Sequence, residues 1–226
     1  MFTDYYNLDG DKVKHVDDGS TDKVIVLTTS SRASKVDAAI SSGQVVATPT
    51  NDALSEMDAA YSNTERTGHE YGFAVATDGT TSSLKTSGND GSVKLSTSYE
   101  ELSNAGKTSS YDVHTHPNTV DANGNVTQIG LPSPSGTKGG TGKTGDTDSY
   151  GKDGPNNRPS VVLGYKVDNV RVDSGTGGSS VTLGGTPQTE QKVTKQIGFY
   201  NSNGQVGKPV NYEDFKKAAQ KVNGQQ

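Results

Sequence analysis

The sequence predicts a mixed α/β fold in which helices cover a modest sheet. Apolar residues recur at helical spacing in 51–63 and again in 212–222, so each segment is expected to lay one face of a helix on a core. Residues 69–77 alternate in the manner of a half-buried strand, and 159–168 read as a core strand. Strand and helix patterns interleave along the chain, which favours one mixed domain.

The composition indicates a small core with long polar loops. Only 28% of the 226 residues are hydrophobic, and 28 residues are glycine. Globular domains are usually close to half apolar. A chain of this length suits one domain with additions. We expect an N-terminal extension at 1–48 and a main domain at 49–226.

The N-terminal extension is expected to hold a β-hairpin and a short helix. Residues 13–16 and 24–27 are apolar-rich and flank the turn-rich segment 17–22. Residues 32–42 carry a weak helical pattern, and Gly43 is placed to end that helix.

The main domain is expected to begin with a helix capped by Asn51 or Asp52, since both side chains can accept from free backbone N–H groups of a first turn. Asp78-Gly79 is a hairpin turn signal after the strand at 69–77. The expected elements in order are a helix at 51–63, strands at 69–77, 81–86 and 92–96, a helix at 98–105, strands at 109–116, 159–168, 181–183 and 196–200, and a helix at 212–222.

Charge and composition exclude several classes of function. The formal net charge is −5, the pI is about 5.3, and no run of five basic residues occurs, which disfavours nucleic-acid binding. Apolar runs of about four residues are too short for a membrane span. The first residues, MFTDYYNLDGDK, lack the basic and apolar regions of a signal peptide. Without cysteine, a metal site must use His, Asp or Glu.

The segment YDVHTHP at 111–117 is the strongest chemical signal in the chain. His114 and His116 are two residues apart on a predicted strand, so their imidazoles should point the same way. A catalytic zinc ion takes three protein ligands and keeps one open position, with Zn–N bonds of about 2.0–2.1 Å. Asp146 or Asp148, in the long polar loop 118–158, could supply the third ligand. The pattern therefore predicts a zinc hydrolase.

Together with an upstream glutamate, these residues resemble the JAB1/MPN/Mov34 (JAMM) metalloprotease family. The family pattern is a Glu on an early strand, then H-x-H-P, then S-x-x-D. Here Glu70 in HEYGF, the HTHP at 114–117 and Pro132-Ser133 match its first parts over about residues 50–170. The resemblance implies a mixed, curved sheet with flanking helices, to which the N-terminal hairpin and the C-terminal helix are additions.

The resemblance also implies roles for individual residues. His114 and His116 would bind zinc, Glu70 would be the general acid/base for the attacking water, and Ser133 would stabilise the oxyanion, with Ser135 as the alternative. The aspartate departs from the pattern, because the third residue after Ser133 is a glycine and the third after Ser135 is a lysine. An insertion in the loop leaves Asp146, or else Asp148, as the candidate ligand.

A narrower resemblance concerns the origin of the chain. The start DYYNLDGDKV, the glycine-rich loop and RPSVVLGYK at 158–166 are similar to JAB-like toxin domains of bacterial Rhs-type polymorphic toxins. This resemblance implies a domain exported within a larger bacterial protein. It would act on a protein or peptide in a target cell and be neutralised by a cognate immunity protein.

Two other interpretations remain open at this point. The missing S-x-x-D spacing favours a catalytically inactive binding module of the same fold. An H-x-H pair can also be incidental on a polar secreted domain, which would bind no metal.

Overall fold

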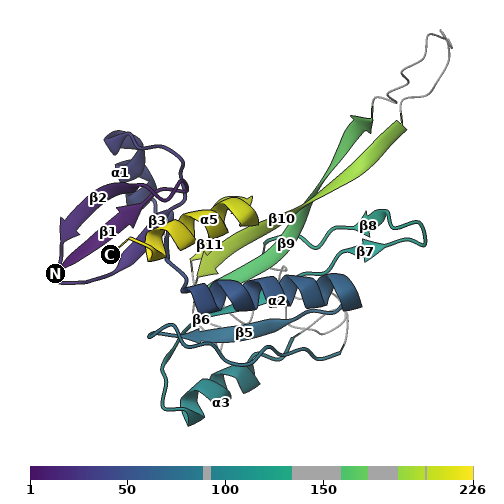
Figure 1. The fold of residues 1–226 in the computed structure, drawn as a ribbon, viewed down its shortest axis with the longest axis horizontal. Coiled ribbons are helices and arrows are strands. Elements are labelled where there is room, and N and C mark those ends of the chain that lie inside the picture. Colours follow the sequence, from purple (N-terminus) through teal and green to yellow (C-terminus); the bar gives the residue numbers. More distant parts are fainter. Residues whose placement is uncertain (89–92, 134–158, 173–187, 202, 226) are drawn as a thin grey trace, which may run out of the picture.

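The computed structural model describes residues 1–88, 93–133, 159–172, 188–201 and 203–225 (Figure 1). It confirms a mixed α/β fold with a C-terminal helix. The strands are β1 (Phe2–Tyr6), β2 (Lys12–Asp17), β3 (Lys23–Val26), β4 (Val45–Ala47), β5 (Gly72–Ala76), β6 (Ser109–Thr115), β7 (Thr119–Val120), β8 (Val126–Gln128), β9 (Ser160–Val172), β10 (Gln188–Asn201) and β11 (Gly204–Asn211). The helices are α1 (Ala33–Ser41), α2 (Asn51–Thr67), α3 (Ser96–Asn104) and α5 (Tyr212–Asn223).

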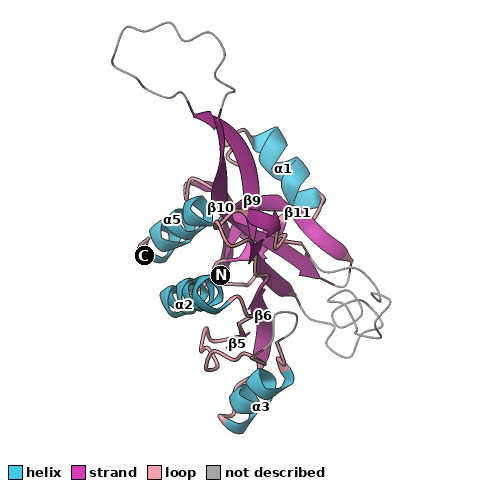
Figure 2. Ribbon diagram, turned by 90° about the vertical axis from the view of Figure 1, so that its right-hand side faces the viewer, coloured by secondary structure: helices cyan, strands magenta, loops and turns pink. Residues whose placement is uncertain are grey.

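A five-stranded sheet in the order β11-β10-β9-β6-β5 forms the centre of the molecule. Strands β6 and β9 run parallel, and the other neighbours are antiparallel. Helices α2 and α5 cover one face of this sheet and α3 covers the other (Figure 2). The main core lies under α2 and α5, where Tyr61 and Phe215 are fully buried.

Helix α2 forms because its ends and its buried face are both encoded locally. The Thr50 hydroxyl accepts from the Ala53 N–H at 3.2 Å, so the N-cap is Thr50 and not Asn51 or Asp52 as expected. Gly68 ends the helix with φ of 72°, a left-handed conformation that glycine adopts readily. Leu54, Met57 and further residues at the same spacing enter the core.

The N-terminal extension forms a second sheet, in the order β2-β1-β3-β4, with α1 packed on it. The hairpin consists of β1 and β2. The expected pairing of 13–16 with 24–27 is wrong, because β1 lies between β2 and β3 and runs parallel to β3. The turn-rich segment after β2 leads to β3, but this turn signal does not reveal that β1 pairs between the two strands.

The two ends of the chain are bound to each other. The Lys23 ammonium donates to the Val222 carbonyl at 3.1 Å, and Lys221 forms an ion pair with Asp11 at 2.6 Å. The extension is thus attached to α5, which itself packs on the central sheet.

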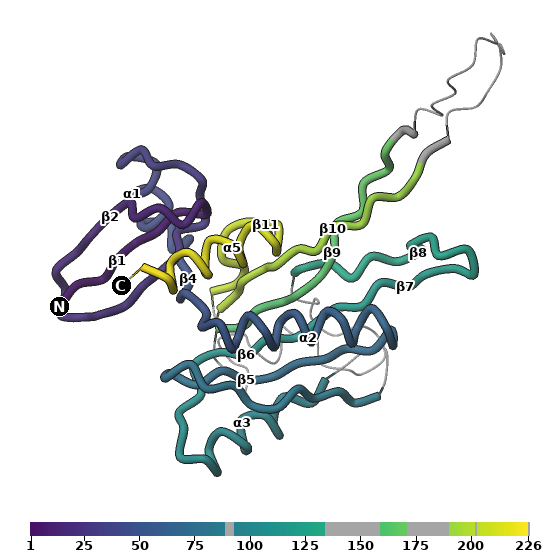
Figure 3. Tube along the Cα trace, viewed as in Figure 1, coloured from purple at the N-terminus to yellow at the C-terminus, as the bar shows by residue number. Residues whose placement is uncertain are grey.

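Strands β9 and β10 form a long hairpin that projects from the rest of the molecule (Figure 3). Their pairing is continuous from Ser160↔Tyr200 to Val172↔Gln188. The expected strands at 159–168 and 196–200 are therefore parts of longer elements. The expected strand at 181–183 lies outside the described residues.

The segment 80–86 lies beside the outer edge of β5. The expected return strand is reduced to isolated bridges, with Gly72 and Lys85 bonded through both backbone groups at 2.9 and 2.8 Å. The Glu101 carboxylate on α3 accepts from the Ser83 N–H at 2.7 Å and from the Lys85 ammonium at 2.6 Å. Residues 93–95 precede α3 without forming the expected strand.

Replacing Glu101 by Gln should weaken this edge in a pH-dependent way. The Lys85 ammonium, together with Ser83, lowers the pKa of Glu101 from its usual 4.5 to about 2. A depressed carboxylate pKa stabilises the fold above about pH 4.5, and this contribution is lost as the pH falls towards 2. Because the side chain is 40% exposed, we expect a loss of at most about 1 kcal/mol at pH 7.

Urea unfolding of the wild type and Glu101→Gln at pH 7 and at pH 2.5 measures this effect. The stability difference should shrink at the lower pH. The exposed neighbour Glu100→Gln is the matched control, and an equal loss in both variants would contradict the assigned role.

Candidate metal and catalytic site

Strand β6 places both histidines on the face of the sheet that α3 covers. His114 is 2% exposed and pairs with Gly72 of β5 and Val162 of β9. His116 follows the end of β6 and is half-buried. As the spacing predicts, the two imidazoles approach each other, with ring centroids 5.1 Å apart and Nε2 atoms 3.3 Å apart.

The separation of these two nitrogens fits a shared metal ion. Two nitrogens bound to one tetrahedral zinc, each about 2.05 Å from it, lie about 3.3 Å from each other. The His116 Nδ1–H donates to the Leu131 carbonyl at 2.8 Å. A carbonyl can only accept, so Nδ1 carries the proton, and in the neutral ring Nε2, which faces His114 Nε2, is the nitrogen with the lone pair. The pair has the spacing that zinc requires, and His116 has the tautomer.

Glu70 precedes β5 and lies next to the end of β6 that carries His116. The register Gly72↔His114 continues for one more residue, because the Thr115 N–H donates to the Tyr71 carbonyl at 2.9 Å. Regular pairing stops at this point, and Glu70 and His116 are the next residues of the two segments. The glutamate is in the loop between α2 and β5, whereas the expected strand began at residue 69.

The segment 130–132 crosses the same face of the sheet over two glycines. A Cβ on Gly164 would lie 2.5 Å from the Gly130 carbonyl oxygen, and a Cβ on Gly198 would lie 1.8 Å from the Pro132 carbonyl oxygen. Only glycine permits this approach of backbone to backbone. The crossing brings the Leu131 carbonyl to His116 and leads to the half-buried Ser133, the candidate oxyanion donor.

Asp146, Asp148 and Ser135 lie outside the described residues. Within the part of the chain that the structure describes, no group of three His, Asp or Glu side chains gathers closely enough to hold a metal ion. Glu70 is therefore not assembled with the two histidines as a third ligand.

A buried carboxylate next to the pair was not among the site residues predicted from the sequence. Asp112 is fully buried, lies on the same face of β6 as His114, and accepts hydrogen bonds from the hydroxyls of Tyr99 and Ser160. The alternation of Asp112, His114 and His116 in DVHTH was the available signal. The partners come from two other elements, α3 and β9, which only the fold brings to Asp112, so the sequence did not reveal the network.

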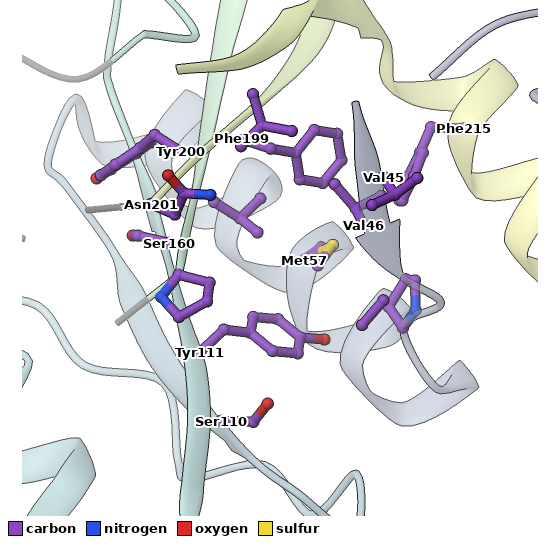
Figure 4. A pocket seen from close by; sticks show the side chains of 15 residues that line it. Val45, Val46, Met57, Ser110, Tyr111, Ser160, Phe199, Tyr200, Asn201 and Phe215 are labelled. Atoms are coloured by element: carbon purple, nitrogen blue, oxygen red, sulfur yellow. The ribbon is translucent and has the colours of Figure 1, made fainter. Parts of the chain in front are cut away.

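A separate cavity of about 170 Å³ lies at the other end of β6 (Figure 4). Met57, Tyr111, Phe199 and Phe215 are among the apolar and aromatic residues of its wall, and β4 of the N-terminal extension lines one side. Burial raises the pKa of the Tyr111 phenol well above its usual value. The cavity is lined mainly by apolar residues and by neither histidine of the pair, so it is distinct from the candidate metal site.

A scan against protein-family models and searches of curated proteins and of solved structures found no match to this chain. Among the described helices, none combines the length and the apolar character needed to cross a membrane.

The glycine crossing predicts that Gly198→Ala disturbs the site. The new methyl group would overlap the Pro132 carbonyl and push segment 130–132 off the sheet. We expect a loss of about 1–3 kcal/mol in urea unfolding, the usual range for overpacking. The Nδ1 proton of His116 should also lose its acceptor, which nitrogen NMR shifts of the ring report.

Gly224→Ala is the matched control, because a Cβ there would meet its nearest neighbour at 3.6 Å. Its stability should stay within about 0.5 kcal/mol of the wild type. An unchanged His116 ring in Gly198→Ala would show that the crossing does not orient this histidine.

Proposed function

We propose that this protein is a zinc-dependent metallopeptidase that hydrolyses peptide or isopeptide bonds. The observation that carries the proposal is the 3.3 Å separation of the His114 and His116 Nε2 atoms, with the His116 tautomer set by the Leu131 carbonyl. Both histidines would bind the ion through Nε2. The resemblance to the JAMM metalloproteases suggests Asp146, or else Asp148, as third ligand.

The other roles follow from chemistry near this pair. Zinc, when bound, supplies Lewis-acid activation of water near neutral pH. Glu70, on the segment beside His116, would take the proton of the attacking water and return it to the leaving amine. Ser133, or Ser135 further along the same loop, would donate a hydrogen bond to the developing oxyanion.

We further propose that the chain is the effector domain of a larger exported bacterial protein. This part rests on the similarity of its start and of its 118–166 region to JAB-like toxin domains. Under this proposal it acts on a protein or peptide in the target cell, and a cognate immunity protein binds it in the producing cell.

One alternative function has support of its own. A 3.3 Å contact between ring nitrogens also suits a hydrogen bond between two histidines. Together with the departure from S-x-x-D spacing, this favours a non-catalytic binding module of the same fold. Metal content separates the two proposals.

Purified protein should contain about one zinc per chain, measured by elemental analysis after dialysis against trace zinc. His114→Ala should lose the metal, because it removes one of three ligands. His15→Ala, which changes an exposed histidine of β2, should keep it. Wild-type protein without zinc would contradict the metallopeptidase proposal and favour the binding module.

Glu70→Gln should separate metal binding from turnover. The variant keeps the side-chain shape and should bind zinc as the wild type does, but it cannot accept the proton of the attacking water. We expect hydrolysis to fall by about 10²–10⁴-fold. The measurement uses internally quenched random peptides, half of them joined through a lysine side chain.

The control is Glu65→Gln, which changes a carboxylate at the end of α2 that pairs with Lys195 at 3.2 Å. It should retain wild-type turnover. Full activity in Glu70→Gln would remove this glutamate from the mechanism.

A further inference from the structure

Thr115, the residue between the two histidines, has a side chain on the opposite face of the sheet. It is fully buried under α2, because alternation along β6 turns it away from the imidazoles. Its hydroxyl lies 2.6 Å from the hydroxyl of Thr64, in the last turn of α2. The strand that carries the histidines is thereby connected to the helix that precedes Glu70.

The same hydroxyl binds the backbone next to Glu70. The Tyr71 N–H donates to Thr115 Oγ1 at 2.9 Å, and Thr115 Oγ1 donates to the Tyr71 carbonyl at 3.3 Å. The Thr64 hydroxyl is the third partner of Thr115 Oγ1, and either hydroxyl can be the donor in that contact.

The hydrogen bonds between Thr115 and the Tyr71 backbone lie at the point where the regular pairing of β5 with β6 stops. Strand β5 begins at Gly72, and the backbone N–H of Tyr71 bonds to a side chain in place of a strand carbonyl. This N–H belongs to the peptide group that joins Glu70 to Tyr71. The Thr115 hydroxyl therefore fixes the orientation of that peptide group, and with it the direction in which the Glu70 side chain leaves the backbone.

We propose that Thr115 is a positioning residue that holds the Glu70 segment in register with the histidine pair. It touches neither metal nor substrate, and it acts through the Glu70–Tyr71 peptide. The residue type follows from the geometry, because the Tyr71 N–H needs an acceptor at this point and Thr115 Oγ1 supplies it. This inference rests on the proposed function for the role of Glu70, whereas the backbone contacts themselves do not.

Thr115→Val tests the proposal, with Thr115→Ser as the conservative variant. Valine has nearly the same shape but offers no acceptor to the Tyr71 N–H. Amide exchange at Tyr71, followed by NMR on the full chain, should accelerate about tenfold or more in Thr115→Val and remain close to wild type in Thr115→Ser. Thr64→Val, which leaves both Thr115–Tyr71 bonds in place, should change it far less.

The catalytic consequence is measured on the same variants. Zinc affinity of Thr115→Val should stay within about twofold of the wild type, since both histidines remain. Hydrolysis of the quenched peptides should fall about 10–100-fold in kcat, with KM little changed, and recover in Thr115→Ser.

Three results would overturn the inference. Unchanged Tyr71 exchange in Thr115→Val would show that the hydroxyl does not hold this peptide group. Loss of zinc in that variant would show that Thr115 shapes the histidine strand instead. Accelerated exchange with wild-type kcat would show that Glu70 needs no such support. A wild type that binds no zinc rejects the proposed function alone, because the exchange measurement still decides the backbone contact.

Discussion

The pairing of β6 on both of its edges is the constraint on which the site depends. Gly72 pairs with His114 on one side and Val162 pairs with it on the other, so the backbone of this strand cannot slide. A shift by one residue would turn both imidazoles towards α2 and place Thr115 on the α3 face. The position of the histidines is thus a property of the whole sheet.

Close approach of backbone segments is the second requirement. Gly72 makes room for Leu95 and His114, since a Cβ there would lie 2.9 Å from the Leu95 side chain and 3.1 Å from His114 Cβ. Gly164 and Gly198 let segment 130–132 lie flat on the neighbouring strands. Three glycines on three strands therefore leave space on the α3 face around the histidine pair, where other segments approach the strands closely. The rest of that face is filled by larger side chains such as Tyr200.

Much of the fold could be predicted from local patterns. Helices α2 and α5 lie close to where apolar spacing placed them, because each buries one regular face. Strand β6 also lies close to its expected position, although its residues 112–115 are buried on both faces of the sheet. Predictions were poorer where pairing joins distant segments. The insertion of β1 between β2 and β3, and the length of the β9–β10 hairpin, depend on hydrogen bonds between strands that have no local signal.

For the candidate site, the sequence by itself determined which chemical groups are available. These are two histidines two residues apart on a strand, a glutamate upstream and a serine-rich loop, in a chain without cysteine. Only the tertiary structure decided which atoms meet. It brought the Leu131 carbonyl to His116, set the Nε2 separation, and revealed Asp112 and Thr115 as buried polar residues on opposite faces of one strand. The physical reason is that alternation along a strand is local, whereas the partners on each face come from distant segments that the sheet and its helices bring together.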